Sequence, residues 1–404
     1  MTGLLTDRLQ RITTHLQEHY ITPGKLVGCQ TLVAQHGKVA YSSALGRMDR
    51  ERDKPMREDT IFRIYSMTKP ITSVALMSLY EQGHFQLNDP VSKVIPEWRD
   101  QQVYVSGDAH SMQTKAPARP VTFRHVLNHS GGLTYGGGLN PPGSPVHPVD
   151  AVYAKLGLAR GGREDLATFV RKMGQVPLRY EPGERWMYSF STDVCGYLVQ
   201  ALSGMPFEDY LQKHIFDPLG MRDTAFSIAP DKIDRFAANY VRKEDKTLAV
   251  MDDPHKSTYA KPPVFVSGGG GLVSTMADYH RFCEMLRRGG ELDGARILGP
   301  RTLRLMAQNH LPGGRDLTQL ALGSFSETAN EGIGFGLGFA TTLGEVAAGG
   351  YGAGDFYWGG MASTIFWVDP VEDLVVIFMT QLVPSGTFNI RSQLKSLIYS
   401  ALVD

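Results

Sequence analysis

The chain begins with a polar segment in which apolar residues recur every three or four positions. These apolar positions are Leu5, Leu9, Ile12 and Leu16. A period of this length predicts an amphipathic helix with one buried face. Two β-rich runs follow, residues 26–35 and 38–42, joined by His36-Gly37. Because Gly readily adopts a tight turn between strands, the pattern predicts an antiparallel hairpin.

Strand patterns return towards the end of the chain. Three runs there are rich in β-branched and aromatic residues: 333–342, 362–368 and 374–381. Residues 369–373, Asp-Pro-Val-Glu-Asp, have the composition of a hairpin turn. A helical apolar pattern over 390–403 comes last. Regular β character is also expected over 264–273, before a helix that Ser274 or Thr275 caps.

The middle of the chain alternates helical patterns with long loops. The helices expected there span 123–127, 163–173, 192–203 and 206–215. The loop 136–148 is dense in Gly and Pro, which favours either a lid or a surface insertion. The patterns together predict an α+β fold. Residues 1–86 and 260–404 would build one domain around an antiparallel sheet, residues 87–259 a mostly helical second domain, and the active site would lie between them.

The amino-acid composition favours some classes of protein function over others. Lys and Arg number 41, Asp and Glu number 41, and 42% of residues are hydrophobic. This balance favours a soluble globular enzyme and gives no support to a nucleic-acid or membrane-surface partner. The first residues lack the pattern of a secretory signal, and three widely separated cysteines predict buried thiols rather than a disulfide framework. We therefore expect a cytoplasmic protein.

One stretch suggests chemistry: Ser66-Met67-Thr68-Lys69-Pro70, followed by an apolar helical pattern that Gly83 ends. Residues three apart lie on one helix face, so Lys69 can reach the Ser66 hydroxyl. At a helix start the Ser66 N–H would also be an unpaired donor, suited to a developing oxyanion. The pattern alone does not separate a nucleophile from a capping serine. Ser392 and Lys395 match it too, in the last helix, where a solvated pair is expected.

Motifs for competing chemistries are missing from the sequence. It has no Gly-x-Ser-x-Gly, His-Glu-x-x-His or P-loop, and the glycine-rich runs 334–338 and 350–354 lack the strand-turn-helix context of dinucleotide sites. We expect no metal and no cofactor. A serine nucleophile without a histidine base needs a lysine, or a tyrosine whose phenolate that lysine stabilises.

Several stretches resemble the serine β-lactamase/penicillin-recognising superfamily, and are most similar to its class C β-lactamase-like esterases, the family VIII carboxylesterases. They are 66–70, 87–91, 126–133, 181–184, 188–189 and 268–275, in this order along nearly the whole chain. The resemblance implies a serine β-lactamase-like fold. It agrees with the sheet and helical domains expected from the patterns.

The resemblance also implies roles for residues. Tyr188 would be the catalytic tyrosine beside Ser66 and Lys69. The Lys-Thr-Gly strand of lactamases is replaced by Trp358, Gly359 and Gly360, which would bind substrate. The next backbone N–H, that of Met361, would complete the oxyanion hole with that of Ser66.

Phe190 stands in the substrate site where such lactamases carry Asn. The missing Asn and Lys remove groups suited to a lactam side-chain amide and carboxylate. The resemblance therefore implies a serine carboxylesterase that hydrolyses short-chain acyl esters through an acyl-enzyme on Ser66, with room for slow β-lactam turnover.

The expected partner is a small-molecule ester, and the oligomeric state stays open. Three alternatives remain: an acyltransferase, a β-lactamase or D-alanyl peptidase, and a non-catalytic ligand sensor on the same fold.

Overall fold

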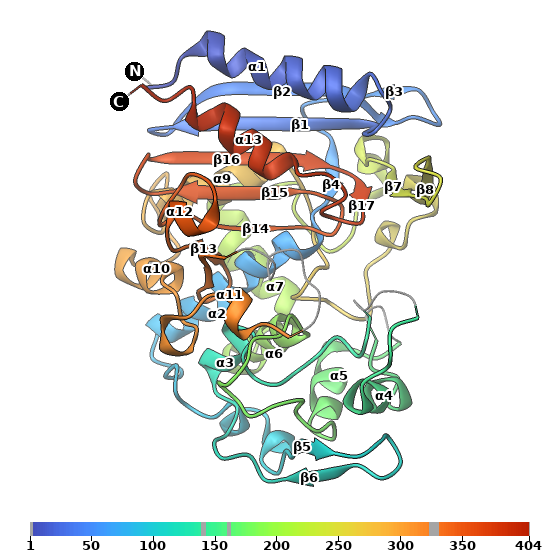
Figure 1. Cartoon of the computed structure of the whole chain (residues 1–404), viewed down its shortest axis with the longest axis vertical. Coiled ribbons are helices and arrows are strands. Elements are labelled where there is room, and N and C mark those ends of the chain that lie inside the picture. The colour runs from blue at the N-terminus through green and yellow to red at the C-terminus, as the bar shows by residue number, and fades with distance from the viewer. Residues whose placement is uncertain (1–2, 139–142, 160–162, 323–330, 404) are drawn as a thin grey trace.

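The largest element of the structure, a computed structural model, is an eight-stranded sheet whose neighbouring strands are all antiparallel (Figure 1). The structure describes residues 3–138, 143–159, 163–322 and 331–403. The strand order is β12-β13-β14-β15-β16-β1-β2-β3. Their bounds are β1 Gly28–Gln35, β2 Lys38–Asp49, β3 Lys54–Pro55, β12 Ile333–Phe335, β13 Ala340–Thr342, β14 Phe356–Gly359, β15 Ile365–Asp369 and β16 Leu374–Thr380.

Strands from the two ends of the chain meet at the centre of the sheet. β1 pairs with β16 over seven residue pairs, with Leu32 opposite Ile377. Every side chain of β16 is buried, which explains why its sequence is apolar up to the final Thr380. The sheet thus combines strands from both ends of the chain, and the predicted α+β fold class is confirmed.

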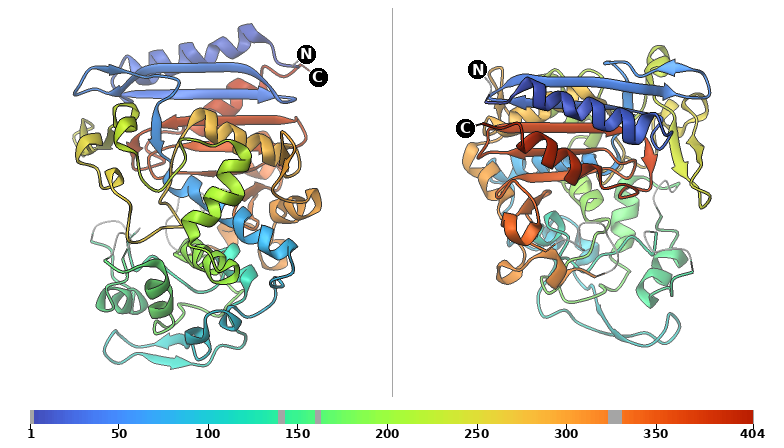
Figure 2. Two further views of the ribbon diagram at one scale, coloured as in Figure 1. Left: turned by 180° about the vertical axis from the view of Figure 1, so that it is seen from behind. Right: turned by 45° about the horizontal axis from the view of Figure 1, so that its top comes forward.

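Helices cover both faces of this sheet (Figures 1 and 2). α1 (Thr6–Leu16) and α13 (Ile390–Tyr399) lie side by side on one face, and α9 (Met276–Arg287) lies on the other. α1 buries Leu9, Ile12 and Leu16, as its period predicted. The Thr275 hydroxyl caps α9 by accepting a hydrogen bond from the Asp278 N–H at 3.2 Å.

A mostly helical region adjoins the far edge of the sheet. Its centre is α2 (Thr68–Glu81), which packs against α6 (Ser191–Ser203). The remaining α-helices of the described residues, in both regions, are α3 Phe123–Leu127, α4 Pro148–Lys155, α5 Leu166–Met173, α7 Phe207–Leu211, α8 Asp217–Leu219, α10 Pro300–Ala307, α11 Leu317–Leu320 and α12 Glu345–Ala348. The short strands are β4 Ile61–Arg63, β5 Val103–Ser106, β6 Gln113–Lys115, β7 Asn239–Arg242, β8 Leu248–Asp252, β9 Val273–Thr275, β10 Glu291–Leu292, β11 Ala295–Arg296 and β17 Leu382–Val383.

Two expectations about elements were wrong, and one helix was not predicted. The run 333–342 is a hairpin of β12 and β13 rather than one strand, because the chain turns at Gly338, whose φ is +99°. Only β9 is regular within 264–275. Helix α4 was not predicted, since it follows directly on the Gly/Pro-rich loop, of which residues 139–142 lie outside the described residues.

The second Ser-x-x-Lys pair has a different environment from the one expected. Ser392 is exposed, but the Lys395 side chain is only 12% exposed and forms an ion pair with the fully buried Asp355. This lysine therefore fastens α13 to the sheet.

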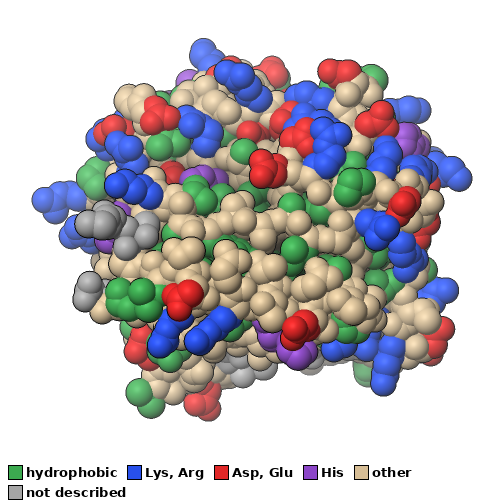
Figure 3. Space-filling view, turned by 90° about the horizontal axis from the view of Figure 1, so that it is seen from above, with side chains coloured by type: hydrophobic (Ala, Val, Ile, Leu, Met, Phe, Trp, Pro, Cys, Tyr) green, Lys and Arg blue, Asp and Glu red, His purple; other side chains and the backbone are tan. Residues whose placement is uncertain are grey.

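The surface carries interspersed charges of both signs on the face shown in Figure 3. Among the described residues, no helix combines the length and the apolar character needed to cross a membrane. The three cysteines are buried and free, as predicted, so none forms a disulfide.

Candidate active site

Ser66 lies in a single 3-10 turn, Tyr65–Met67, that leads directly into α2. Tyr65 has a φ of +41°, a left-handed conformation that costs energy for a bulky residue. Two hydrogen bonds secure the turn. The Asn239 side-chain amide donates to the Tyr65 hydroxyl at 2.9 Å, and the Tyr279 hydroxyl donates to the Met67 carbonyl at 2.9 Å. The serine is thus presented on a strained, well-anchored turn.

Lys69 lies one helical turn further on, as the spacing predicts. Its Nζ is 3.2 Å from Ser66 Oγ and donates to the Gly269 carbonyl at 2.6 Å. The side chain is 1% exposed, and its Nζ lies 4.5 Å from the centre of the Tyr188 ring. The structure therefore brings Tyr188, from a distant part of the chain, together with Ser66 and Lys69.

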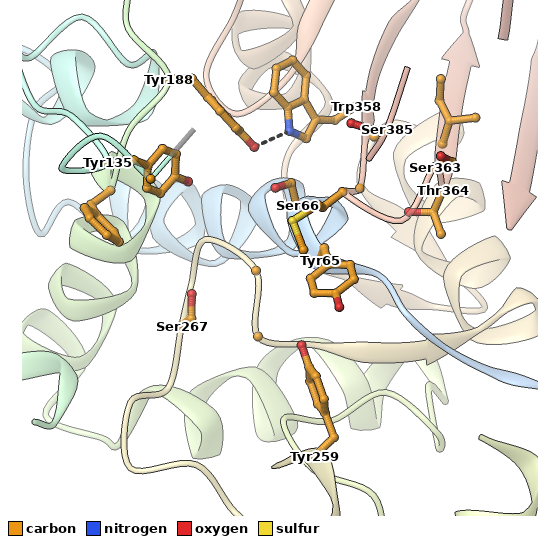
Figure 4. A pocket seen from close by; sticks show the side chains of 18 of the residues that line it. Tyr65, Ser66, Tyr135, Tyr188, Tyr259, Ser267, Trp358, Ser363, Thr364 and Ser385 are labelled. Atoms are coloured by element: carbon orange, nitrogen blue, oxygen red, sulfur yellow. Dashed lines mark hydrogen bonds between the residues drawn. The ribbon is translucent and has the colours of Figure 1, made fainter. Parts of the chain in front are cut away.

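Tyr188 lies on the chain segment just before α6, and Figure 4 shows its hydroxyl directed towards Trp358 on β14. The Trp358 indole N–H donates to the Tyr188 oxygen at 3.2 Å. A donor at this position stabilises negative charge on the phenol oxygen. Trp358, expected in substrate binding, thus also contacts the tyrosine expected to act as base.

His129 supports Tyr188 from behind. Its ring centre lies 5.1 Å from that of Tyr188, and it is hydrogen-bonded to Ser189 (3.2 Å) and Thr192 (3.4 Å). Burial, together with the nearby charge of Lys69, lowers the pKa of His129 well below its usual range. A neutral imidazole therefore packs against the tyrosine, and it adds no second positive charge beside Lys69.

The end of β14 runs past the Ser66 turn. A Cβ added to Gly360 would lie 2.4 Å from the Ile64 carbonyl oxygen and 2.3 Å from Thr364 Oγ1. Only glycine permits this approach. Gly359, Gly360 and Met361 all line the cavity that Ser66 faces.

This cavity has a volume of about 1320 Å³ and is walled by both halves of the protein. Figure 4 shows Ser66 near its centre, with Tyr135 and Tyr188 on one side and Ser363, Thr364 and Ser385 on the other. Phe190 also lines it, yet it is 1% exposed and packs against the ring of Tyr135. The site therefore offers an aromatic wall at Phe190.

Two contributors to the site were not predicted from the sequence. One is the Gly269 carbonyl, which accepts the 2.6 Å hydrogen bond from Lys69. The other is Tyr135, whose ring centre is 5.7 Å from Lys69 Nζ. The only indication of either was the glycine-rich composition of runs 268–271 and 136–138. The described residues contain no group of three or more His, Cys, Asp or Glu side chains arranged to hold a metal.

Comparison with known proteins places this geometry in a family. The family model described as Beta-lactamase matches residues 10–398. Esterase EstB of Burkholderia gladioli is 33% identical over 382 residues, which cover 90% of this chain and 88% of EstB.

Two solved structures have the same fold. "EstCE1, a hydrolase with promiscuous acyltransferase activity" superimposes with a TM-score of 0.80 at 28% identity and covers 98% of this chain and 99% of its own. Simvastatin synthase (LovD) of Aspergillus terreus also gives a TM-score of 0.80, at 22% identity, with 97% of each chain covered. The chain belongs to the β-lactamase family of penicillin-recognising serine hydrolases, on its esterase branch.

Proposed function

We propose that the protein is a family VIII carboxylesterase that hydrolyses short-chain acyl esters through an acyl-enzyme on Ser66. The observation that carries this proposal is the buried Lys69 Nζ, which lies 3.2 Å from Ser66 Oγ and against the face of Tyr188. Ser66 and Tyr188 both line a large cavity. The relationship to Esterase EstB supports the ester substrate.

In the proposed reaction, Ser66 Oγ attacks the ester carbonyl and loses its proton to the Tyr188–Lys69 pair. The N–H groups of Ser66 and Met361 stabilise the oxyanion, and a donor of this kind contributes about 3 kcal/mol in other enzymes. The pair returns the proton to the leaving alcohol as the C–O bond breaks. Water then attacks the acyl-enzyme, gives its proton to the same pair, and releases the carboxylic acid and Ser66.

The choice of ester over lactam rests on two positions. Trp358 replaces the lysine of the Lys-Thr-Gly strand, and its N–H is engaged with Tyr188. Phe190 replaces the amide-binding Asn and packs among aromatic rings. An ester needs neither the lysine nor the Asn, so we expect p-nitrophenyl butyrate to be hydrolysed much faster than nitrocefin.

Labelling with a fluorophosphonate tests the nucleophile. We expect a single adduct on the peptide that contains Ser66, and loss of both the adduct and p-nitrophenyl butyrate hydrolysis in Ser66→Ala. Ser392→Ala is the matched control, because it alters the other Ser-x-x-Lys serine. Full activity in Ser66→Ala would refute the mechanism, and a nitrocefin rate equal to the ester rate would favour a β-lactamase.

Acyl transfer is a second candidate, favoured by the size of the cavity. Its 1320 Å³ exceeds the roughly 300–1,000 Å³ of ordinary ligand pockets, which leaves room for an acceptor alcohol beside the acyl group. The structural relative EstCE1 is described as having promiscuous acyltransferase activity. Product analysis with added alcohols decides: a new ester indicates transfer, and free acid alone indicates hydrolysis.

A further inference from the structure

A buried carboxylate that takes no part in the proposed reaction is connected to Lys69 through a single residue, Gly269. Asp193, in the first turn of α6, is 0% exposed. Its Oδ1 accepts hydrogen bonds from the Ser267 hydroxyl at 2.6 Å and from the Gly269 N–H at 3.0 Å. Its Oδ2 is also buried and has no hydrogen-bond partner among the described residues.

Gly269 connects this carboxylate to the lysine. Its N–H points to Asp193, while its carbonyl accepts the 2.6 Å hydrogen bond from Lys69 Nζ. The fit is close: a Cβ at Gly269 would lie 2.6 Å from Asp193 Oδ2. Asp193 therefore fixes the orientation of the residue whose carbonyl receives the lysine.

Burying the Asp193 carboxylate costs free energy of desolvation, and its surroundings offset only part of that cost. The two hydrogen-bond donors to Asp193 are neutral groups, and a buried charge that lacks an opposite charge is destabilising. Two donors and the positive end of the α6 dipole favour the carboxylate. Asn would accept the same two hydrogen bonds through its carbonyl oxygen without a buried charge. Hydrogen bonding alone therefore does not explain an acid here.

We propose that Asp193 is a positioning residue that orients the Gly269 carbonyl on Lys69 and, by its negative charge, favours the ammonium form of this lysine in the resting enzyme. This proposal rests on the proposed function, since it assigns Lys69 to the base of the acyl-enzyme reaction. It makes α6 a common support for that base: Tyr188 precedes the helix, and Asp193 lies in its first turn.

The other groups around Lys69 show how the contribution of Asp193 differs from theirs. Tyr188 presents its ring face at 4.5 Å, Tyr135 lies at 5.7 Å, and Ser66 Oγ at 3.2 Å. His129, on the segment after α3, is a titratable neighbour whose lowered pKa keeps it neutral. Asp193 is thus the carboxylate linked to Lys69 through the Gly269 backbone.

The Asp193→Asn variant tests the proposal, because Asn retains an acceptor for Ser267 and Gly269 but lacks the charge. With p-nitrophenyl butyrate we expect kcat to fall about 10- to 100-fold, part of the factor of about 10²–10⁴ that a positioned general base supplies. KM should change less than about twofold, since Asp193 does not line the cavity. Removal of the anion favours the neutral amine, which stabilises the Tyr188 phenolate less, so the alkaline limb of the pH–kcat profile should move to lower pH.

The matched control is Asp278→Asn, which neutralises another buried carboxylate, at the start of α9. It should leave kcat and the pH profile unchanged. The thermal midpoint separates positioning from folding: Asp193→Asn should unfold no earlier than the wild type, since it removes a buried charge.

Two results would overturn the proposal: an Asp193→Asn profile that coincides with that of Asp278→Asn, or an activity loss that only tracks loss of folded protein. Absence of a Ser66 adduct in the wild-type protein would instead refute the proposed function, so the two failures are distinguishable.

Discussion

The contact between Trp358 and Tyr188 has a direction that matters for catalysis. The indole N–H can only donate, so the phenol oxygen must accept. This arrangement stabilises the phenolate that appears when Tyr188 transfers its proton to the leaving alcohol. Trp358 therefore acts on the base as well as on the shape of the site.

Trp358→Phe should lower kcat about 10-fold or more, since a hydrogen bond to a charged group contributes about 1.5–3 kcal/mol. Trp367→Phe on the neighbouring strand β15 removes an equally buried indole away from the cavity and serves as the control. Steady-state kinetics of both variants with p-nitrophenyl butyrate measure the effect. Equal kcat values in the two variants would show that only packing was lost.

At the scale of residues, the sequence predicted those parts of the site whose side chains are close together along the chain. Ser66 and Lys69 are three residues apart where a 3-10 turn leads into α2, so their proximity follows from local helical geometry. Tyr188 could be assigned only through the family resemblance. The Gly269 carbonyl and the link from Asp193 could not be predicted, because a backbone acceptor has no residue-type signature and its position depends on tertiary packing.

Among the elements around the site, the end of β14 tolerates little change. Gly360 passes so close to Ile64 that a methyl group would push the strand away from the Ser66 turn. The N–H of Met361, proposed for the oxyanion hole, would move with it.

Gly360→Ala should therefore lower kcat/KM by about 10²-fold or more, the cost of losing one oxyanion donor. Gly350→Ala is the control, because a Cβ there meets nothing within 4 Å. Kinetics with p-nitrophenyl butyrate and circular dichroism of both variants check the prediction. Wild-type activity in Gly360→Ala would mean that the strand end is not part of the site.

Element prediction succeeded where one periodicity extends over a whole segment, as in α1, α9 and β16. It failed where glycines change the path of the chain. The turn at Gly338 splits one apolar run into two strands, and its Cβ position lies 2.3 Å from Ser73 Oγ of α2. That close approach is a property of the folded molecule, and apolar periodicity does not contain it.

At the scale of the whole molecule, buried neutral histidines make stability depend on pH. Burial is the main reason that the pKa of His125 falls from 6.5 to about 4. In its neutral form, His125 Nδ1 accepts the Thr122 N–H at 3.2 Å and completes the cap of α3. The unfolded chain binds a proton near pH 6.5 and the folded chain only near pH 4, so protons favour unfolding between these values.

The stabilising contribution of neutral His125 to the free energy of unfolding should therefore be complete above pH 6.5 and decline as the pH falls towards 4. His125 would account for up to about 3 kcal/mol of this decline. Urea unfolding at pH 7 and pH 5 measures it in the wild type and in His125→Gln, which keeps an acceptor but does not titrate. The decline should be smaller in the variant, and an identical decline would assign the effect to other groups.

The arrangement of strands also sets the order in which the site can form during synthesis. Residues 66–69 leave the ribosome long before residues 356–360 and 374–380, which supply the strand beside the nucleophile and the centre of the sheet. Until those last strands arrive, β1 has no partner on one edge, and the apolar α2 lacks part of its cover. Catalytic competence is therefore a late event in biosynthesis. Chains stalled before residue 356 should be inactive, aggregation-prone intermediates with exposed apolar surface, and should depend on chaperones.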